Sequence, residues 1–177
     1  KQTIPFKIES TFHEHLLDQL TMLTLDERQR KIAEQIVGSI DDDGYLRRDF
    51  GAITDDLAFR QNIAATEDEI GELVKQIQQF DPPGICARDL RECLLLQLER
   101  KRQEGSEVEM TINILSDYFD EFTKKHYEKI QRGLNLTDDG LKLAISQIIR
   151  LNPKPGGNIG EVNKAESYII PDFFIHN

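Results

Sequence analysis

Tryptophan is absent from the 177-residue chain, and aromatic residues together make up only 7% of it. Long apolar runs are also missing: Cys93–Leu96 is among the longest, whereas a helix that crosses a bilayer needs about 20 apolar residues. The basic and apolar segments of a secretory leader do not open the sequence. These absences predict a cytoplasmic protein without a membrane partner.

Sulfur and imidazole ligands are scarce as well. The chain has two cysteines, Cys86 and Cys93, and four histidines whose spacing gives no pair of metal ligands. The cysteines lie seven positions apart on an expected helix, roughly 10 Å along its axis, which is too far for a disulfide. We therefore predict buried thiols and no metal site.

Motifs for catalysis are not found in this sequence. It has neither a glycine-rich phosphate loop nor a recognisable arrangement of nucleophile and base. Asp41–Asp43 are consecutive rather than alternating, so with Gly44 they predict a helix-ending turn instead of a calcium loop. We expect no cofactor and no enzymatic activity.

An excess of basic residues is missing too. The formal net charge is −10, and residues 41–72 alone hold ten acids and three bases. Proteins that bind duplex DNA use Lys and Arg to neutralise phosphates, which disfavours nucleic acid as the main target. A protein partner of mixed charge fits better, and a merely solvated acidic surface is the open alternative.

Signals for helices are abundant. At Thr11, Thr24 and Thr66 a hydroxyl stands three residues before a carboxylate. This spacing is typical of the capping box, a motif that begins helices. Leu and Ile then recur at three- and four-residue steps, and Thr137 opens a further helix. The pattern predicts an all-α fold whose first helix covers about residues 12–21.

Proline, glycine and polar clusters divide these helices into two small subdomains. We predict an N-terminal linker over residues 1–10, a helical bundle over 11–106 and a helix-turn-helix-like unit over 107–157. Residues 158–177 are rich in β-forming side chains interrupted by Pro171, which predicts an extended arm or an edge strand.

Three stretches carry the most specific motifs. They are IVGSIDDDGYL at 36–46, IQQFDPPGICARDLRECLLLQL at 77–98, and LNPKPG at 151–156 followed by YIIPD at 168–172. In order and spacing they resemble the sigma-54 family of transcription initiation factors, and the second repeats that family's signature almost without departure. Asn152, where the family usually has Asp, is a minor departure.

The resemblance implies an all-helical domain that binds core RNA polymerase, with the beta and beta-prime subunits as expected contacts. Sigma-54 factors also use a separate C-terminal part for promoter DNA and an N-terminal part for ATP-dependent activators. This chain shows neither part, so we expect those partners to bind elsewhere on the full-length protein. Residues 158–177 would then lead towards the DNA-binding region.

The first two stretches also contain residues with expected structural roles. In the first, Gly44, Tyr45 and Leu46 form the turn that the family shares. In the second, Asp81, Pro82 and Gly84 should make a tight corner.

The helix after the corner carries the candidate contacts. Asp89 should favour the positive N-terminal end of that helix, and Leu90 should face the core with other leucines of the same stripe. Arg88, Arg91 and Glu92 are the candidate polymerase contacts. That the arginines only join two helices is an equally open alternative.

Two other classes of function compete with this interpretation. One is a stand-alone helical adaptor for another protein. The other is a helix-turn-helix regulator that uses residues 137–151 as its recognition helix. That segment carries only Lys142 and Arg150 as bases, with Gln147, which is a poor set for reading DNA bases.

Overall fold

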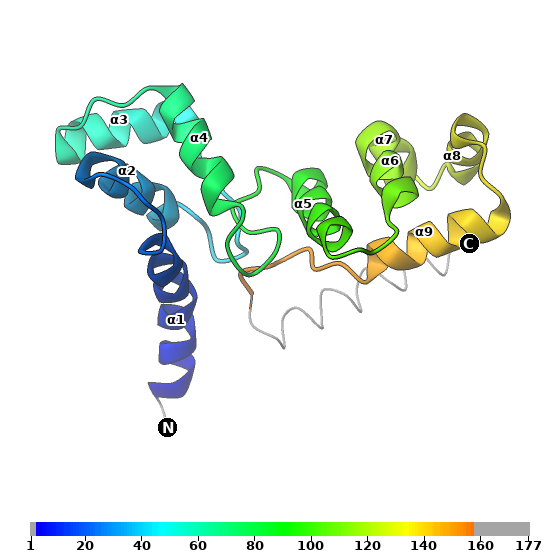
Figure 1. Ribbon diagram of the computed structural model, residues 1–177, viewed down its shortest axis with the longest axis horizontal. Coiled ribbons are helices and arrows are strands. Elements are labelled where there is room, and N and C mark those ends of the chain that lie inside the picture. Colours follow the sequence, from blue (N-terminus) through cyan, green and yellow to red (C-terminus); the bar gives the residue numbers. More distant parts are fainter. Residues whose placement is uncertain (1–2, 158–177) are drawn as a thin grey trace.

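A computed structural model describes residues 3–157, and helices fill most of this range (Figure 1). They are α1 (Thr3–Leu20), α2 (Glu27–Gly38), α3 (Phe50–Gln61), α4 (Glu67–Ile77), α5 (Leu90–Gln103), α6 (Glu109–Asp117), α7 (Phe119–Thr123), α8 (Tyr127–Leu134) and α9 (Asp138–Ile149). The described range contains no strand, only one isolated bridge between Tyr45 and Ala87. The predicted all-α fold is confirmed. No helix in this range is long and apolar enough to span a bilayer.

The helices form two groups, each around its own apolar core (Figure 1). We call residues 3–80 the N-terminal lobe, residues 81–89 the corner, and residues 90–157 the C-terminal lobe. Fully buried side chains of the first core include Leu16, Leu20, Ile32, Ile36, Ile53, Leu57, Ile70 and Ile77, and Ile85 and Cys86 of the corner join them. The second core includes Leu98, Val108, Ile114, Leu115, Phe122, Ile130, Ile145 and Ile148.

The cores separate at the corner rather than at the expected boundary between residues 106 and 107. Leu94 and Leu98 of α5 pack into the second core, which places α5 in the C-terminal lobe. The polar residues at the end of α5 had indicated a linker, but they are helical as far as Gln103. Arg102 there forms ion pairs with Glu99 in the same helix and with Glu109 at the start of α6.

Two of the expected helix starts are wrong and two are confirmed. α1 begins at Thr3, so Thr11 lies inside a helix and residues 3–10 are helical where a linker was expected. Thr24 does not cap α2, because Asp26, a stronger N-cap, forms the box with Gln29. Thr66 caps α4 through the predicted box with Glu69. Thr137 caps α9 by accepting a hydrogen bond from the amide of residue 140.

Two further expectations concern the ends of elements. α2 ends at Gly38, well before Gly44, which takes its left-handed φ of 99° in a separate turn. Cys86 lies in the corner with a φ of 69° rather than on a helix with Cys93, although both thiols are free and buried as predicted. The arm expected over residues 158–177 lies outside the described residues.

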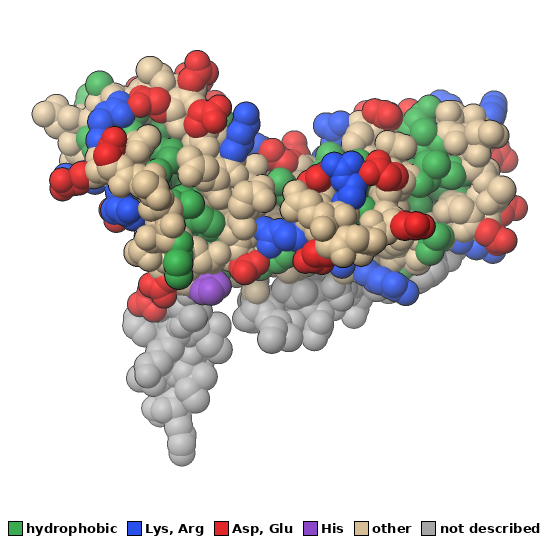
Figure 2. Space-filling view, in the orientation of Figure 1, with side chains coloured by type: hydrophobic (Ala, Val, Ile, Leu, Met, Phe, Trp, Pro, Cys, Tyr) green, Lys and Arg blue, Asp and Glu red, His purple; other side chains and the backbone are tan. Residues whose placement is uncertain are grey.

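The two lobes differ in charge. The N-terminal lobe holds sixteen acids and eight bases, whereas the C-terminal lobe holds eleven of each. Acidic side chains gather over α3 and α4 at the outer end of the N-terminal lobe, while both signs alternate over the C-terminal lobe (Figure 2). Most of the net negative charge of the chain therefore belongs to the N-terminal lobe.

Candidate functional site at the junction of the two lobes

The turn after α2 forms the first side of the junction. The Asp41 carboxylate accepts hydrogen bonds from the backbone amides of Asp43 at 2.9 Å and Tyr45 at 3.1 Å. Gly44 follows with a positive φ, and a Cβ on it would lie 2.7 Å from the amide nitrogen of Gly156. Only glycine fits this backbone conformation and this close approach.

The corner runs beside this turn and is bonded to it through the backbone. The amide of Cys86 donates to the Gly44 carbonyl at 2.8 Å, and the amide of Leu46 donates to the Ala87 carbonyl at 2.9 Å. A Cβ on Gly84, which has a φ of 90°, would lie 2.8 Å from the side-chain nitrogen of Gln97. The corner is therefore bonded through its backbone to the N-terminal lobe, and at Gly84 its backbone lies close against α5.

Asp81 connects the start of the corner to α1 and α5. Its amide and carbonyl both bond to the carboxamide of Gln19, each at 2.8 Å. Its carboxylate accepts from Arg100 at 2.9 Å, and the same guanidinium donates to the backbone carbonyls of Gln79 and Phe80. The peptide bond between Asp81 and Pro82 is cis.

Arg88 is occupied inside the molecule. One guanidinium nitrogen donates to the carbonyls of Leu46 and Arg48, both at 2.8 Å, and the guanidinium lies 4.5 Å from the centroid of the Phe50 ring. The Arg88 amide donates to the Glu92 carboxylate at 2.6 Å. Both residues thus hold the entry of α5 against the N-terminal lobe.

The start of α5 meets some of its expected roles. Asp89 is the N-cap, with its carboxylate accepting from the amide of Glu92 at 2.9 Å. Arg91 donates to the carbonyls of Leu115 and Ser116 at the end of α6. Leu90 was expected to face the core, but it is 40% exposed, because the first residue of α5 lies beyond the edge of the second core.

The segment after α9 forms the third side of the junction and runs back towards the corner (Figure 1). The Gln97 carboxamide bonds to both backbone groups of Asn152, accepting from its amide at 2.8 Å and donating to its carbonyl at 2.7 Å. The Tyr45 hydroxyl donates to the Pro153 carbonyl at 2.7 Å, and the Gly156 amide donates to the Asp43 carbonyl at 2.9 Å.

Burial controls the ionisable groups at the centre of the junction. It raises the pKa of the Cys86 thiol to about 12 and also raises the pKa of Cys93. The pKa of the Tyr45 hydroxyl is raised as well, first by burial and then by the neighbouring Cys93. All three groups stay protonated at neutral pH, as suits packing and hydrogen bonding rather than nucleophilic chemistry.

Sequence reasoning had given no junction role to Gln19, Gln97 and Arg100, although each makes two or more bonds to the backbone at the junction. Gln97 lies within the second stretch that resembles the family, but neither glutamine nor arginine shows by its residue type which backbone groups it will bind. Within the described chain, no group of three or more His, Cys, Asp or Glu side chains could hold a metal ion.

Comparison with known proteins identifies the family. The family model described as Sigma-54 factor, core binding domain matches residues 5–177. The chain belongs to this family. Among similar proteins, the RNA polymerase sigma-54 factor of Pseudomonas aeruginosa (strain UCBPP-PA14) is 36% identical over 165 residues, which cover 93% of this chain and 32% of that protein. The RNA polymerase sigma-54 factor of Escherichia coli (strain K12) is 32% identical over 169 residues, covering 94% of this chain and 34% of that protein.

The three stretches that resemble the sigma-54 family are those that meet at the junction. Residues 41–46, 81–89 and 152–156 lie far apart in the sequence and are bonded to one another in the structure. The described part of the family signature therefore fixes how one lobe is held against the other. The chain spans about a third of the length of the curated relatives it matches.

Proposed function

We propose that this chain binds core RNA polymerase as the core-binding domain of a sigma-54 transcription initiation factor. The observation that carries the proposal is the match of the family model to residues 5–177. The junction supports it, since a fixed arrangement of two lobes presents a broad surface to a large partner without a cost of ordering on binding. The family match does not favour an adaptor or a helix-turn-helix regulator.

We also propose that the domain acts without catalysis, in the cytoplasm, and that it contacts the beta and beta-prime subunits. Promoter DNA and ATP-dependent activators would be bound by other parts of the full-length factor. Arg88, Arg91 and Glu92 stay predicted polymerase contacts. All three residues bond inside the molecule, but only Arg91 is exposed, so it is the better candidate of the three.

The test is a titration of the fluorescently labelled chain with purified core RNA polymerase, followed by anisotropy. Circular dichroism of the same sample verifies that the chain is helical. We expect saturable binding that an unlabelled full-length sigma-54 factor displaces. A helical chain that shows no saturable binding, or binding that the full-length factor leaves unchanged, would contradict the proposal.

A further inference from the structure

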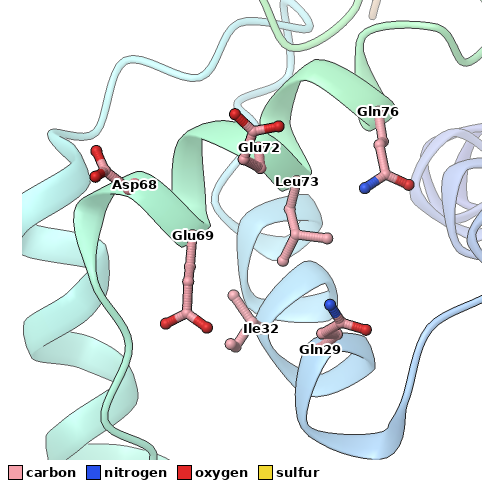
Figure 3. A pocket seen from close by; sticks show the side chains of 7 residues that line it. All are labelled: Gln29, Ile32, Asp68, Glu69, Glu72, Leu73 and Gln76. Atoms are coloured by element: carbon pink, nitrogen blue, oxygen red, sulfur yellow. The ribbon is translucent and has the colours of Figure 1, made fainter.

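A groove between α2 and α4 in the N-terminal lobe combines an apolar floor with an acidic edge (Figure 3). Ile32 of α2 and Leu73 of α4 form the floor, and Asp68, Glu69 and Glu72 of α4 contribute carboxylates. The volume is about 270 Å³. Small-molecule sites usually enclose about 300–1,000 Å³. The groove therefore suits one or two side chains of a protein partner better than a cofactor.

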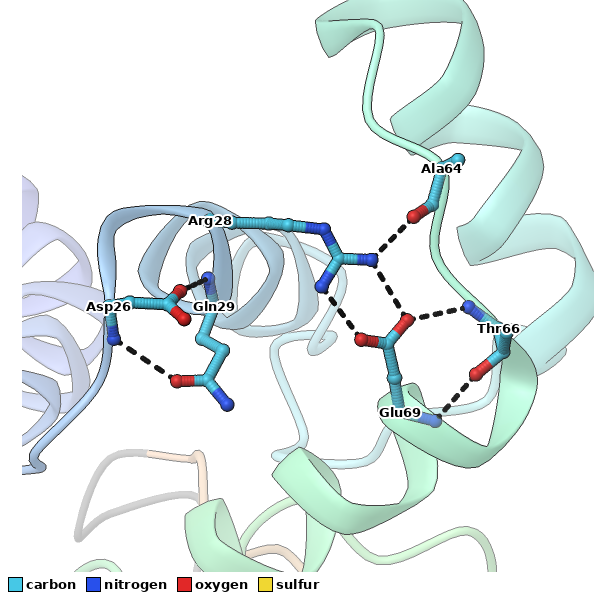
Figure 4. A network of polar contacts seen from close by, with 6 residues as sticks. All are labelled: Asp26, Arg28, Gln29, Ala64, Thr66 and Glu69. Carbon is cyan, nitrogen blue, oxygen red and sulfur yellow. Dashed lines mark hydrogen bonds and ion pairs between the residues drawn. The ribbon is translucent and has the colours of Figure 1, made fainter.

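Two capping boxes hold the groove in shape (Figure 4). Asp26 and Gln29 form one at the start of α2, and Thr66 and Glu69 form the other at the start of α4. Arg28 connects the two helices by donating to both oxygens of Glu69, at 2.7 and 2.9 Å. The walls are thus set by internal hydrogen bonds before any partner arrives.

The contact between Arg28 and Glu69 also shows which chemistry the groove accepts. The hydrogen bonds from Arg28 lower the pKa of the Glu69 carboxyl to about 2, so this group is an anion at neutral pH. A carboxylate on the α4 wall thus already binds a guanidinium in the two-bond geometry that arginine favours.

The outer carboxylates of the groove can each bind a further cation. Asp68 is exposed, and its carboxylate makes no ion pair or hydrogen bond with another described residue. Glu72 has Lys75 at 3.8 Å, but both side chains are 75% exposed, and such pairs contribute little. Figure 3 shows these two carboxylates on the outer side of α4, above the floor formed by Leu73 and Ile32. Both can bind a cation that approaches from outside.

We propose that this groove docks a basic segment of core RNA polymerase. The aliphatic stem of a Lys or Arg side chain would lie in the groove above Leu73, with the fully buried Ile32 beneath it, and cationic heads would meet Asp68 and Glu72. Long basic side chains bury their stems on apolar surface in this way. The excess of acids in the N-terminal lobe attracts such a segment before contact. This inference rests on the proposed function and adds the chemistry of the docked segment.

The experiment compares two charge-reversed variants of the chain in the titration with purified core RNA polymerase. The test variant carries Asp68→Lys and Glu72→Lys. The control variant carries Glu34→Lys and Asp55→Lys, which are exposed acids of the same lobe outside the groove. Both variants change the net charge equally. We expect Kd to rise at least tenfold for the test variant and less than threefold for the control.

The outcomes separate the two proposals. If both variants weakened the binding of polymerase equally, or if neither did, docking at the groove would be contradicted. The proposal that the chain binds polymerase would remain intact. Absence of binding by the helical wild-type chain would overturn both. If circular dichroism shows that the reversals unfold the chain, Asp68→Asn with Glu72→Gln replaces them, and a loss of about threefold is expected against Glu34→Gln with Asp55→Asn.

A photo-crosslinker at Gln76, an exposed residue that lines the groove, supplies an independent readout. Crosslinked polymerase peptides identified by mass spectrometry should contain Lys or Arg next to the crosslinked position. Crosslinking to acidic or uncharged peptides alone, or no crosslinking by a variant that still binds, would overturn the proposal.

Discussion

The two lobes are built by the same means but carry different surfaces. Each packs amphipathic helices around a core made mostly of Leu and Ile. The N-terminal lobe nevertheless has twice as many acids as bases, while the C-terminal lobe is balanced. Because similar cores form under both charge distributions, the acidic excess is not needed for folding. Net charge of this kind governs association with partners.

The lobes also differ in what they contribute to the junction. The N-terminal lobe mainly offers backbone groups, such as the carbonyls of Asp43, Leu46 and Arg48. The corner and the C-terminal lobe offer long side chains, Arg88 and Gln97, that bond to backbone. A junction fixed through backbone atoms tolerates few changes of main-chain geometry. The relative position of the acidic and balanced surfaces therefore depends on a few residues.

Gly44→Ala should break the connection between the lobes most strongly. The left-handed backbone costs a non-glycine residue roughly 1–2 kcal/mol, and the Cβ would press on backbone of the segment after α9. We expect the free energy of unfolding to fall by about 3 kcal/mol. We also expect one urea transition to separate into two, as each lobe unfolds by itself. Circular dichroism through a urea titration measures both effects.

Gly38→Ala is the matched control for this change. Gly38 ends α2, has no neighbour within 4 Å of an added Cβ, and should gain slightly in stability from the helix preference of alanine. If the free energy of unfolding fell no further in Gly44→Ala than in Gly38→Ala, the turn would not connect the lobes.

Gln97→Ala should have the next largest effect. The substitution leaves the amide and carbonyl of Asn152 without their partner in a partly buried place, which costs about 2 kcal/mol. Urea unfolding measures the change, with Gln103→Ala at the exposed end of α5 as control, for which we expect a change within about 0.5 kcal/mol. Equal effects of the two substitutions would show that Gln97 does not stabilise the junction.

The elements of this fold could be predicted from sequence because their signals are local. A hydroxyl at Thr66 or Thr137 and an apolar stripe after it lie within one helix. The same locality explains the failure at Thr24, since Asp26 offered a competing box two residues later. The lobe to which α5 belongs was not predictable from its own residues. The apolar stripe of α5 indicates that this helix packs against other helices, but it does not show which ones.

The junction marks the limit of sequence reasoning more sharply. The two prolines and the glycine of the second stretch indicated a corner from their own residue types, because backbone conformation is a local property. The role of Arg88 depends instead on carbonyls about 40 positions earlier, and Gln97 binds a residue 55 positions later. A charged residue in a motif suggests a partner, and only the fold shows that this partner is the chain itself.

Glu69→Gln should have the smallest effect. It tests whether the negative charge of Glu69 stabilises the N-terminal lobe. Glutamine can keep the capping box with Thr66 but loses the ion pair with Arg28, and exposed pairs contribute only about 0.2–1 kcal/mol. The folded protein lowers the pKa of Glu69 to about 2, whereas an unfolded glutamate titrates near 4.3. Because the folded pKa is the lower one, the stabilisation is complete above pH 4.3 and is lost as pH falls towards 2.

The advantage of the wild-type chain over Glu69→Gln should therefore be constant near neutral pH and vanish between about pH 4.3 and 2. Urea unfolding at a series of pH values measures this difference. Glu34→Gln, an exposed change on α2, serves as control and should show no such window. A difference that persists at pH 2 would mean that Glu69 stabilises the lobe through packing or capping rather than through its charge. The acidic excess would then contribute nothing to holding α2 against α4, which would leave association with a basic partner as its role.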